Sequence, residues 1–133
     1  MNDYNFTIII ESFPKLRARQ GTNKRTGKRY FYTPKKTATF EQSLSFLVRS
    51  KFKQLPLLDS VGIDIVCFIT RPKSVKRKFP CVKPDNDNYL KSICDSLNGI
   101  LFADDGQIID SRIRKFYADD CLPCIKISVW KID

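Results

Sequence analysis

A ten-residue stretch near the middle of the chain, VGIDIVCFIT from Val61 to Thr70, predicts a β-strand buried in the interior. Such a strand needs neighbours in a sheet and other elements that cover it. Further segments with β-rich or alternating patterns predict additional strands: Tyr4–Ser12, Lys28–Thr33, Gln107–Ala118 and Cys124–Ile132. The chain therefore holds enough strands to build one sheet around Val61–Thr70.

Two segments have the periodicity of amphipathic helices. In Thr37–Phe52 apolar residues recur at helical spacing, and Thr37 or Thr39 can cap the start. The second helix ends at Asn98–Gly99, and its apolar stripe is formed by Leu90, Ile93, Cys94 and Leu97. With 133 residues, the chain is expected to form a single α+β domain (1–133), a mixed sheet with two main helices packed on it.

Basic residues are concentrated in two segments that contain no acid, within a chain of net charge +10. The first is Phe13–Thr39, where Pro14–Gly27 predicts a mobile loop, and the second is Arg71–Lys83. Charge of this kind is typical of a surface that binds nucleic acid phosphates. The expected DNA contacts are Lys15, Arg17, Arg19, Lys24, Arg25, Lys28, Arg29, Arg71, Lys73, Lys76, Arg77, Lys78 and Lys83.

Three consecutive aromatic residues, Tyr30, Phe31 and Tyr32, lie inside the first basic segment. They can stack on bases or pack in the core, and we expect at least one of them to pack in the core. An anionic membrane surface is another partner for a basic protein. No basic amphipathic helix is evident, and no apolar run approaches the ~20 residues that span a bilayer. We therefore expect no membrane contact.

The chain contains no histidine, which excludes a Ser-His-Asp or Cys-His arrangement and a histidine general base. Catalysis would have to use carboxylates, Lys, Tyr, Cys or a metal held by oxygen ligands. Five cysteines without the pattern of a secretion signal fit a reducing compartment, so we expect a cytoplasmic protein. Cys121 and Cys124 have CxxC spacing, but a structural zinc needs four ligands, so we expect them to flank a turn.

The stretch KPDNDNYLK places Asp85 and Asp87 at the start of the second helix, directly after a basic segment. Helix capping explains one such residue, whereas four Asp or Asn residues follow one another here, from Asp85 to Asn88. An EF-hand would need Gly at the sixth position and Glu at the twelfth, where this chain has Leu90 and Ser96. Capping and an EF-hand therefore do not account for the whole run.

Asp87, Lys91 and Asp95 are spaced i, i+4 and i+8, so they form either a surface ion-pair ladder or a carboxylate with an ammonium beside it. Further on, Asp104 and Asp105 can form a turn. Carboxylates repel phosphate unless a cation lies between them, and Mg²⁺ is bound by a few carboxylates, waters and substrate oxygens. These residues therefore favour Mg²⁺-dependent phosphodiester cleavage, in which Lys91 contacts the scissile phosphate or stabilises the transition state.

The segment KPDNDNYLKSICDSLNGILFADDGQIIDSRIRK resembles the signature region of the RusA family of Holliday junction resolvases. In that family a D-x-D-N-x-x-K helix start is followed by a D-D-x-Q turn and then a strand. Here the two motifs are matched by Asp85, Asp87, Asn88 and Lys91, and by Asp104, Asp105 and Gln107. The resemblance implies that Asp85, Asp87 and Asp105 are catalytic, metal-binding aspartates and that Lys91 is the essential lysine.

The resemblance also implies a Mg²⁺-dependent homodimer, often borne by a phage or prophage, whose two sites nick opposing strands of a four-way junction and leave 5′-phosphate ends. We therefore hypothesise a RusA-like endonuclease that resolves Holliday junctions in DNA recombination and repair. Three alternatives remain open: a less selective nuclease for branched or flapped DNA, a non-catalytic basic nucleic-acid-binding module, and a redox or zinc protein built on the CLPC motif.

Overall fold

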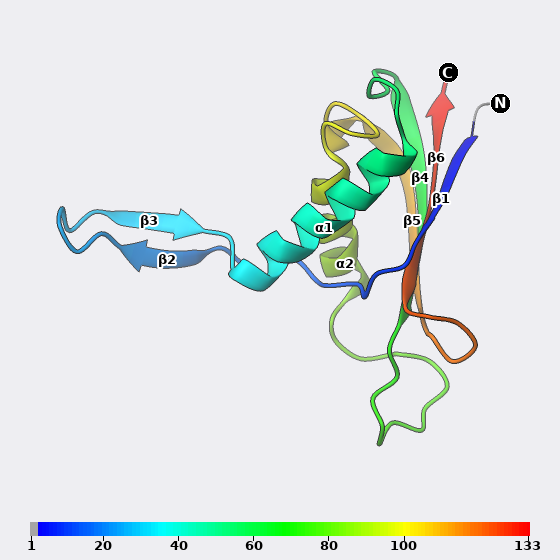
Figure 1. The fold of residues 1–133 in the computed structure, drawn as a ribbon, viewed down its shortest axis with the longest axis horizontal. Coiled ribbons are helices and arrows are strands. Elements are labelled where there is room, and N and C mark those ends of the chain that lie inside the picture. Colours follow the sequence, from blue (N-terminus) through cyan, green and yellow to red (C-terminus); the bar gives the residue numbers. More distant parts are fainter. Residues whose placement is uncertain (1–2) are drawn as a thin grey trace.

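The computed structural model describes residues 3–133 and shows two helices on one face of a four-stranded sheet, with a hairpin that projects from this body (Figure 1). The elements are β1 (Asp3–Ile8), β2 (Arg19–Thr22), β3 (Arg29–Tyr32), α1 (Lys35–Lys51), β4 (Ser60–Ile69), α2 (Asn86–Leu97), the short 3₁₀ helix η1 (Asp105–Gln107), β5 (Ile108–Tyr117) and β6 (Cys124–Ile132). This arrangement confirms the expected α+β fold, with a mixed sheet and two main helices.

The sheet has the strand order β1-β6-β4-β5, and only the β4–β5 pair is parallel among the strands of residues 3–133. β4 lies inside the sheet, between β6 and β5, and its alternate residues Val61, Ile63, Ile65 and Cys67 are fully buried. Both helices cover the same face, and their contribution to the core comes from Phe40, Leu44, Val48, Ile93 and Leu97. The buried strand predicted from the sequence is therefore the centre of the fold.

The parallel pairing of β4 with β5 requires a long crossover connection, and this crossover carries the second basic segment, α2 and η1. Since α2 runs back along the sheet, its first residues lie beside the carboxyl end of the parallel strands, and η1 lies near its other end (Figure 1). The predicted stop of this helix is confirmed: Asn98 is the C-cap, and Gly99 has φ +78°. The first acidic motif therefore forms the start of α2, and the crossover places the second acidic motif beside the same helix.

The segment Pro14–Gly27, expected to be a mobile loop, contains β2, so that expectation is wrong for part of its length. β2 pairs with β3 in an antiparallel hairpin, and Gly27 takes φ +71° in the connecting turn. Core packing of the aromatic run is also wrong, because Tyr30, Phe31 and Tyr32 are all exposed on this hairpin. The polar RQGT sequence of β2 lacks the apolar alternation that would have identified it as a strand.

The start of α1 also differs from the prediction. The helix begins at Lys35 after Pro34, and no side chain caps it. Thr37 is instead buried in the first turn, where its hydroxyl accepts a hydrogen bond from the Leu16 backbone N–H at 3.3 Å and donates to the Pro14 carbonyl at 3.4 Å. Thr37 therefore fastens the preceding loop to α1. No helix within residues 3–133 is both long and apolar enough to cross a membrane.

Candidate active site

Asp85 occupies the N-cap position of α2, but its side chain makes no capping hydrogen bond. The backbone carbonyl of Asp85 accepts hydrogen bonds from the N–H groups of Asn88 at 3.1 Å and Tyr89 at 3.4 Å. The carboxylate is exposed. Helix capping by this side chain, the simplest structural explanation of the residue, is therefore wrong.

Two side chains hold this end of α2 against the sheet. Lys115, on β5, donates hydrogen bonds from Nζ to the carbonyls of Val82 and Pro84, each at 2.7 Å. The Asn86 amide donates to the Ile113 carbonyl at 3.3 Å. Residues before and after Asp85 in the sequence are therefore both hydrogen-bonded to β5, and this fixes the position of Asp85. No local sequence pattern indicated these contacts.

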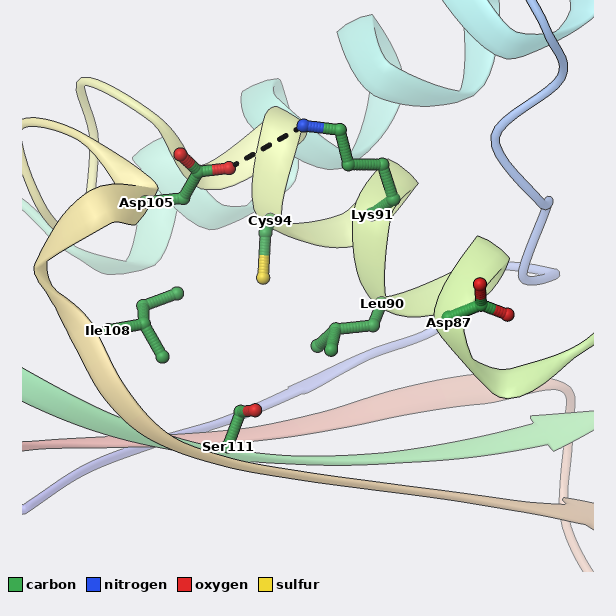
Figure 2. A pocket seen from close by; sticks show the side chains of 7 residues that line it. All are labelled: Asp87, Leu90, Lys91, Cys94, Asp105, Ile108 and Ser111. Atoms are coloured by element: carbon green, nitrogen blue, oxygen red, sulfur yellow. Dashed lines mark ion pairs between the residues drawn. The ribbon is translucent and has the colours of Figure 1, made fainter.

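A pocket of about 250 Å³ lies between α2 and the start of β5, and it contains most of the predicted catalytic residues. Figure 2 shows Lys91 and Asp105 pointing toward one another across it, with 3.8 Å between Lys91 Nζ and Asp105 Oδ2. Asp87 lies at the other end, one helical turn before Lys91 (Figure 2). The remaining lining residues are Leu90, Cys94, Ile108 and Ser111.

The neighbouring aspartates Asp104 and Asp105 have different roles in the structure. Asp104 caps η1: its side chain accepts from the Gly106 N–H at 2.9 Å, and its own N–H donates to Gln107 Oε1 at 2.8 Å. The Gln107 amide also donates to the carbonyls of Leu57 at 2.9 Å and Asp59 at 2.8 Å. The turn predicted for Asp104 is thus confirmed, and Gln107 fastens this turn to the β4 side of the fold so that Asp105 reaches the pocket.

Replacing Gln107 with alanine is expected to lower the free energy of unfolding by about 1–3 kcal/mol, because it removes three hydrogen bonds from the turn that carries Asp105. Urea denaturation followed by circular dichroism measures this change. Gln20→Ala, at an exposed position on the hairpin, is the matched control and should leave the unfolding midpoint unchanged. An equally stable Gln107→Ala variant would contradict the role assigned to Gln107.

Lys91 belongs to a chain of alternating charges that crosses three elements. Its ammonium lies 3.3 Å from Asp95 Oδ1, and the other oxygen of Asp95 lies 3.0 Å from Lys15 Nζ. Lys15 in turn lies 2.7 Å from Glu41 on α1. Partial burial lowers the pKa of Lys15, but the hydrogen bonds to Glu41 and Asp95 outweigh it, so the pKa is raised overall. Asp95 therefore lies between two ammonium groups, and Lys91 is restrained by both Asp95 and Asp105.

Replacing Asp95 with asparagine is expected to lower the rate of DNA cleavage by about tenfold without preventing folding, because Lys91 loses one of the two carboxylates that restrain it. Single-turnover cleavage at saturating enzyme measures the rate separately from binding. Asp110→Asn, at an exposed position on β5, is the matched control. If both variants cleave at the wild-type rate, Asp95 does not position Lys91.

The predicted DNA contacts fall into two groups. Lys15 is engaged by Glu41 and Asp95, as described above. Arg71 forms a bidentate pair with Asp119 at 2.8 and 2.9 Å, donates to carbonyls of its own loop, and lies 4.2 Å from the centre of the Tyr117 ring. The other eleven predicted contacts are exposed and form no ion pair within residues 3–133. Arg71 therefore shapes the second basic segment, and the exposed cations remain the predicted phosphate contacts.

Comparison with known proteins gives a family match over most of the chain. The model of the family described as endodeoxyribonuclease RusA matches residues 11–130. The chain belongs to the RusA family. It is also 28% identical over 144 aligned positions to YqaN of Bacillus subtilis strain 168, described as an uncharacterized protein, with 99% of both chains covered. The resemblance inferred from the two acidic motifs is thereby confirmed, and the chain is a member of a family of DNA endonucleases.

The three aspartates that the RusA resemblance implies as metal ligands do not lie together. Asp87 and Asp105 share the pocket with Lys91, whereas Asp85 lines a neighbouring groove with Lys83 and Lys115. Within residues 3–133 no three Asp, Glu or Cys side chains converge in the manner of a complete metal site. Two carboxylates still fit Mg²⁺, since this ion commonly takes one or two protein carboxylates and completes its shell with waters and substrate oxygens. The ligand set of this RusA family member stays a prediction.

The cysteines do not supply an alternative centre. Burial, reinforced by Asp105 and Asp95, raises the pKa of the Cys94 thiol to about 12, which disfavours the thiolate that a cysteine nucleophile needs. Cys121 is exposed in the connection before β6, and Cys124 is buried as the first residue of that strand. The two residues between them include a bend but no assigned turn, so the prediction that this pair flanks a turn stays a prediction.

Proposed function

We propose that this protein is a cytoplasmic, Mg²⁺-dependent endonuclease that resolves four-way DNA junctions by paired nicks, in DNA recombination and repair. The observation that supports this most strongly is the pocket that Asp87, Lys91 and Asp105 line, in a member of the RusA family. A carboxylate pair with a lysine beside it suits the charge distribution of a phosphodiester near a divalent cation. The exposed cations of the two basic segments supply the affinity for DNA.

The aspartates and the lysine of the pocket would have different roles at the scissile phosphate. Asp87 and Asp105 would hold Mg²⁺, which when bound lowers the pKa of a water and neutralises charge that develops on the phosphate. Lys91 is exposed over 58% of its side chain, which allows its ammonium to donate hydrogen bonds to a phosphate oxygen. Asp95 keeps that ammonium beside the pocket. Lys91 would therefore stabilise the transition state, while the aspartates position the metal.

Asp85 remains part of the proposed ligand set for two reasons. Its carboxylate is exposed and makes no capping bond, and it lies two residues from Asp87 at the positively polarised end of α2. The partial positive charge at this end of the helix favours carboxylates there. Asp85 would then contact the metal from the groove that borders the pocket.

We further propose that the protein acts as a homodimer. A two-fold dimer presents two equal sites to a junction that is itself two-fold symmetric, so that opposing strands receive one nick each. Hydrolysis in this way would leave 5′-phosphate ends that a ligase can seal. The arrangement requires that both active sites face the same junction.

The test is a panel of labelled substrates of matched sequence: a four-way junction, a three-way junction, a flap and a linear duplex, each incubated with Mg²⁺ or with EDTA. We expect Mg²⁺-dependent cleavage of the four-way junction far above that of the other three. Equal cleavage of the branched and flapped substrates would support the less selective nuclease instead. Binding of all four without cleavage under any divalent cation would support the non-catalytic binding module and would contradict the proposal.

A further inference from the structure

The β2–β3 hairpin forms an arm, residues 19–32, that projects from the body of the molecule beyond the first turn of α1 (Figure 1). The arm contains no acidic residue, and its five cations are Arg19, Lys24, Arg25, Lys28 and Arg29. All five are exposed. An element with this charge repels basic partners and attracts a polyanion such as DNA.

The same arm exposes three large rings that nothing in the described part of the chain covers. Tyr30 is 50%, Phe31 75% and Tyr32 43% exposed. Phosphate binding explains the exposed cations, but it does not explain why three aromatic rings are exposed to water. An exposed apolar patch bordered by charge is the usual mark of an interaction site. The composition of the arm therefore indicates a partner with both phosphates and flat apolar surfaces.

The two tyrosines form one surface. In the hairpin register Tyr32 lies opposite Arg19 and Tyr30 opposite Gly21, so all four residues share a face, and the two rings are 6.0 Å apart between centres. A Cβ atom at Gly21 would lie 2.5 Å from the Tyr30 ring. The Tyr30 ring therefore lies directly over the Gly21 backbone. The side chain of any other residue at position 21 would occupy the space that the ring takes.

We propose that this tyrosine platform stacks on unpaired or unstacked bases at the branch point of DNA, and that the arm is a specificity determinant for branched over linear DNA. The inference rests on the proposed action on branched DNA. In a continuous duplex each base is covered by its neighbours, so an aromatic platform finds no free base face there. At a branch point stacking is interrupted, and every base offers a π-face to a ring. The arm cations contact the surrounding phosphates.

The test measures dissociation constants of the full-length protein in EDTA, which prevents metal-dependent cleavage, for a four-way junction and a linear duplex of the same length. The double variant Tyr30→Ala, Tyr32→Ala should bind the junction about tenfold more weakly and bind the duplex as the wild type does. Tyr30→Phe with Tyr32→Phe should retain junction binding, because the rings remain. A Lys24→Ala, Arg25→Ala variant should weaken both complexes equally and reduce the salt slope by about 1–2.

Two single variants sharpen the result. Gly21→Ala keeps every ring and every charge but displaces the Tyr30 ring, so it should reduce junction binding alone. Phe46→Ala removes an aromatic residue of α1 that is 73% exposed and lies outside the arm, and it should bind both DNAs as the wild type does. Thermal melting should be unchanged in all arm variants, because the arm side chains form no part of the buried core.

The proposal is overturned if the double tyrosine variant binds the junction like the wild type, or if it loses junction and duplex binding equally. It is also overturned if that variant sediments as a monomer while the wild type is a dimer, because the rings would then contact a second copy of the chain. Failure of the proposed function itself gives a different result: the wild-type protein would not cleave the junction in Mg²⁺. Cleavage by the wild type combined with unaltered tyrosine variants would refute only the role of the arm.

Discussion

Replacing Asp105 with asparagine is expected to lower Mg²⁺-dependent cleavage of a four-way junction by about 10²–10³-fold, with junction binding retained. The substitution keeps the size of the side chain but removes the charge that would hold the metal. Asp105 is also the only carboxylate of the DDGQ turn that reaches the pocket in the described structure. Single-turnover cleavage and gel-shift binding, measured on the same preparations, separate catalysis from affinity.

The adjacent residue supplies the control for this experiment. Asp104→Asn changes the same side chain type one position earlier, and asparagine also accepts the hydrogen bond from the Gly106 N–H that caps η1. We therefore expect Asp104→Asn to cleave within about threefold of the wild type, because one cap is exchanged for another of similar strength. A large loss in Asp104→Asn together with an active Asp105→Asn would reverse the roles assigned to the two residues.

Replacing Lys91 with methionine is expected to lower the cleavage rate by about 10²–10³-fold at saturating DNA, because Lys91 is the one cation among the described residues that line the pocket. Methionine keeps most of the length of the side chain and removes its charge. Since Lys91 is largely exposed, the variant should fold with nearly wild-type stability. The rate should fall more than the affinity, and single-turnover kinetics over a range of protein concentrations distinguish the two.

Lys76→Met is the matched control, because it removes an exposed lysine of the second basic segment that lies outside the pocket. This variant should weaken binding and reduce its salt dependence, while the rate in the saturated complex stays unchanged. If Lys91→Met showed the same behaviour as Lys76→Met, Lys91 would be one more phosphate contact and would have no part in the chemical step.

The parts of the fold that were predictable are those that a local pattern determines. The alternation around Ile63 and Ile65 identified the central strand, and the apolar stripe with Gly99 identified α2 and its end. The β5 pattern was weaker, since this strand lies at the edge of the sheet and exposes residues such as Ile109. The hairpin was missed in part because its strands cover no core and therefore need no apolar alternation.

The candidate site was predictable to a similar extent. The i, i+4 spacing of Lys91 and Asp95 indicated their ion pair, and the two acidic motifs indicated the pocket. The contacts of Lys15 with Glu41 and of Lys115 with the Pro84 carbonyl join residues distant in the sequence, so no spacing rule could have revealed them. These side chains were interpreted as DNA contacts or passed over, whereas their role in the structure is to fix the elements that carry the site.

The most direct test of the central claim uses a supercoiled plasmid that extrudes a cruciform, incubated with the wild-type protein in Mg²⁺. Paired nicks across the four-way junction convert the plasmid to a linear form whose ends a ligase can seal, and EDTA should abolish the conversion. The account predicts linear product from the wild type and none from Asp105→Asn. Open-circular product alone, or linear product that persists in EDTA, would contradict a Mg²⁺-dependent junction resolvase with its active site at Asp87, Lys91 and Asp105.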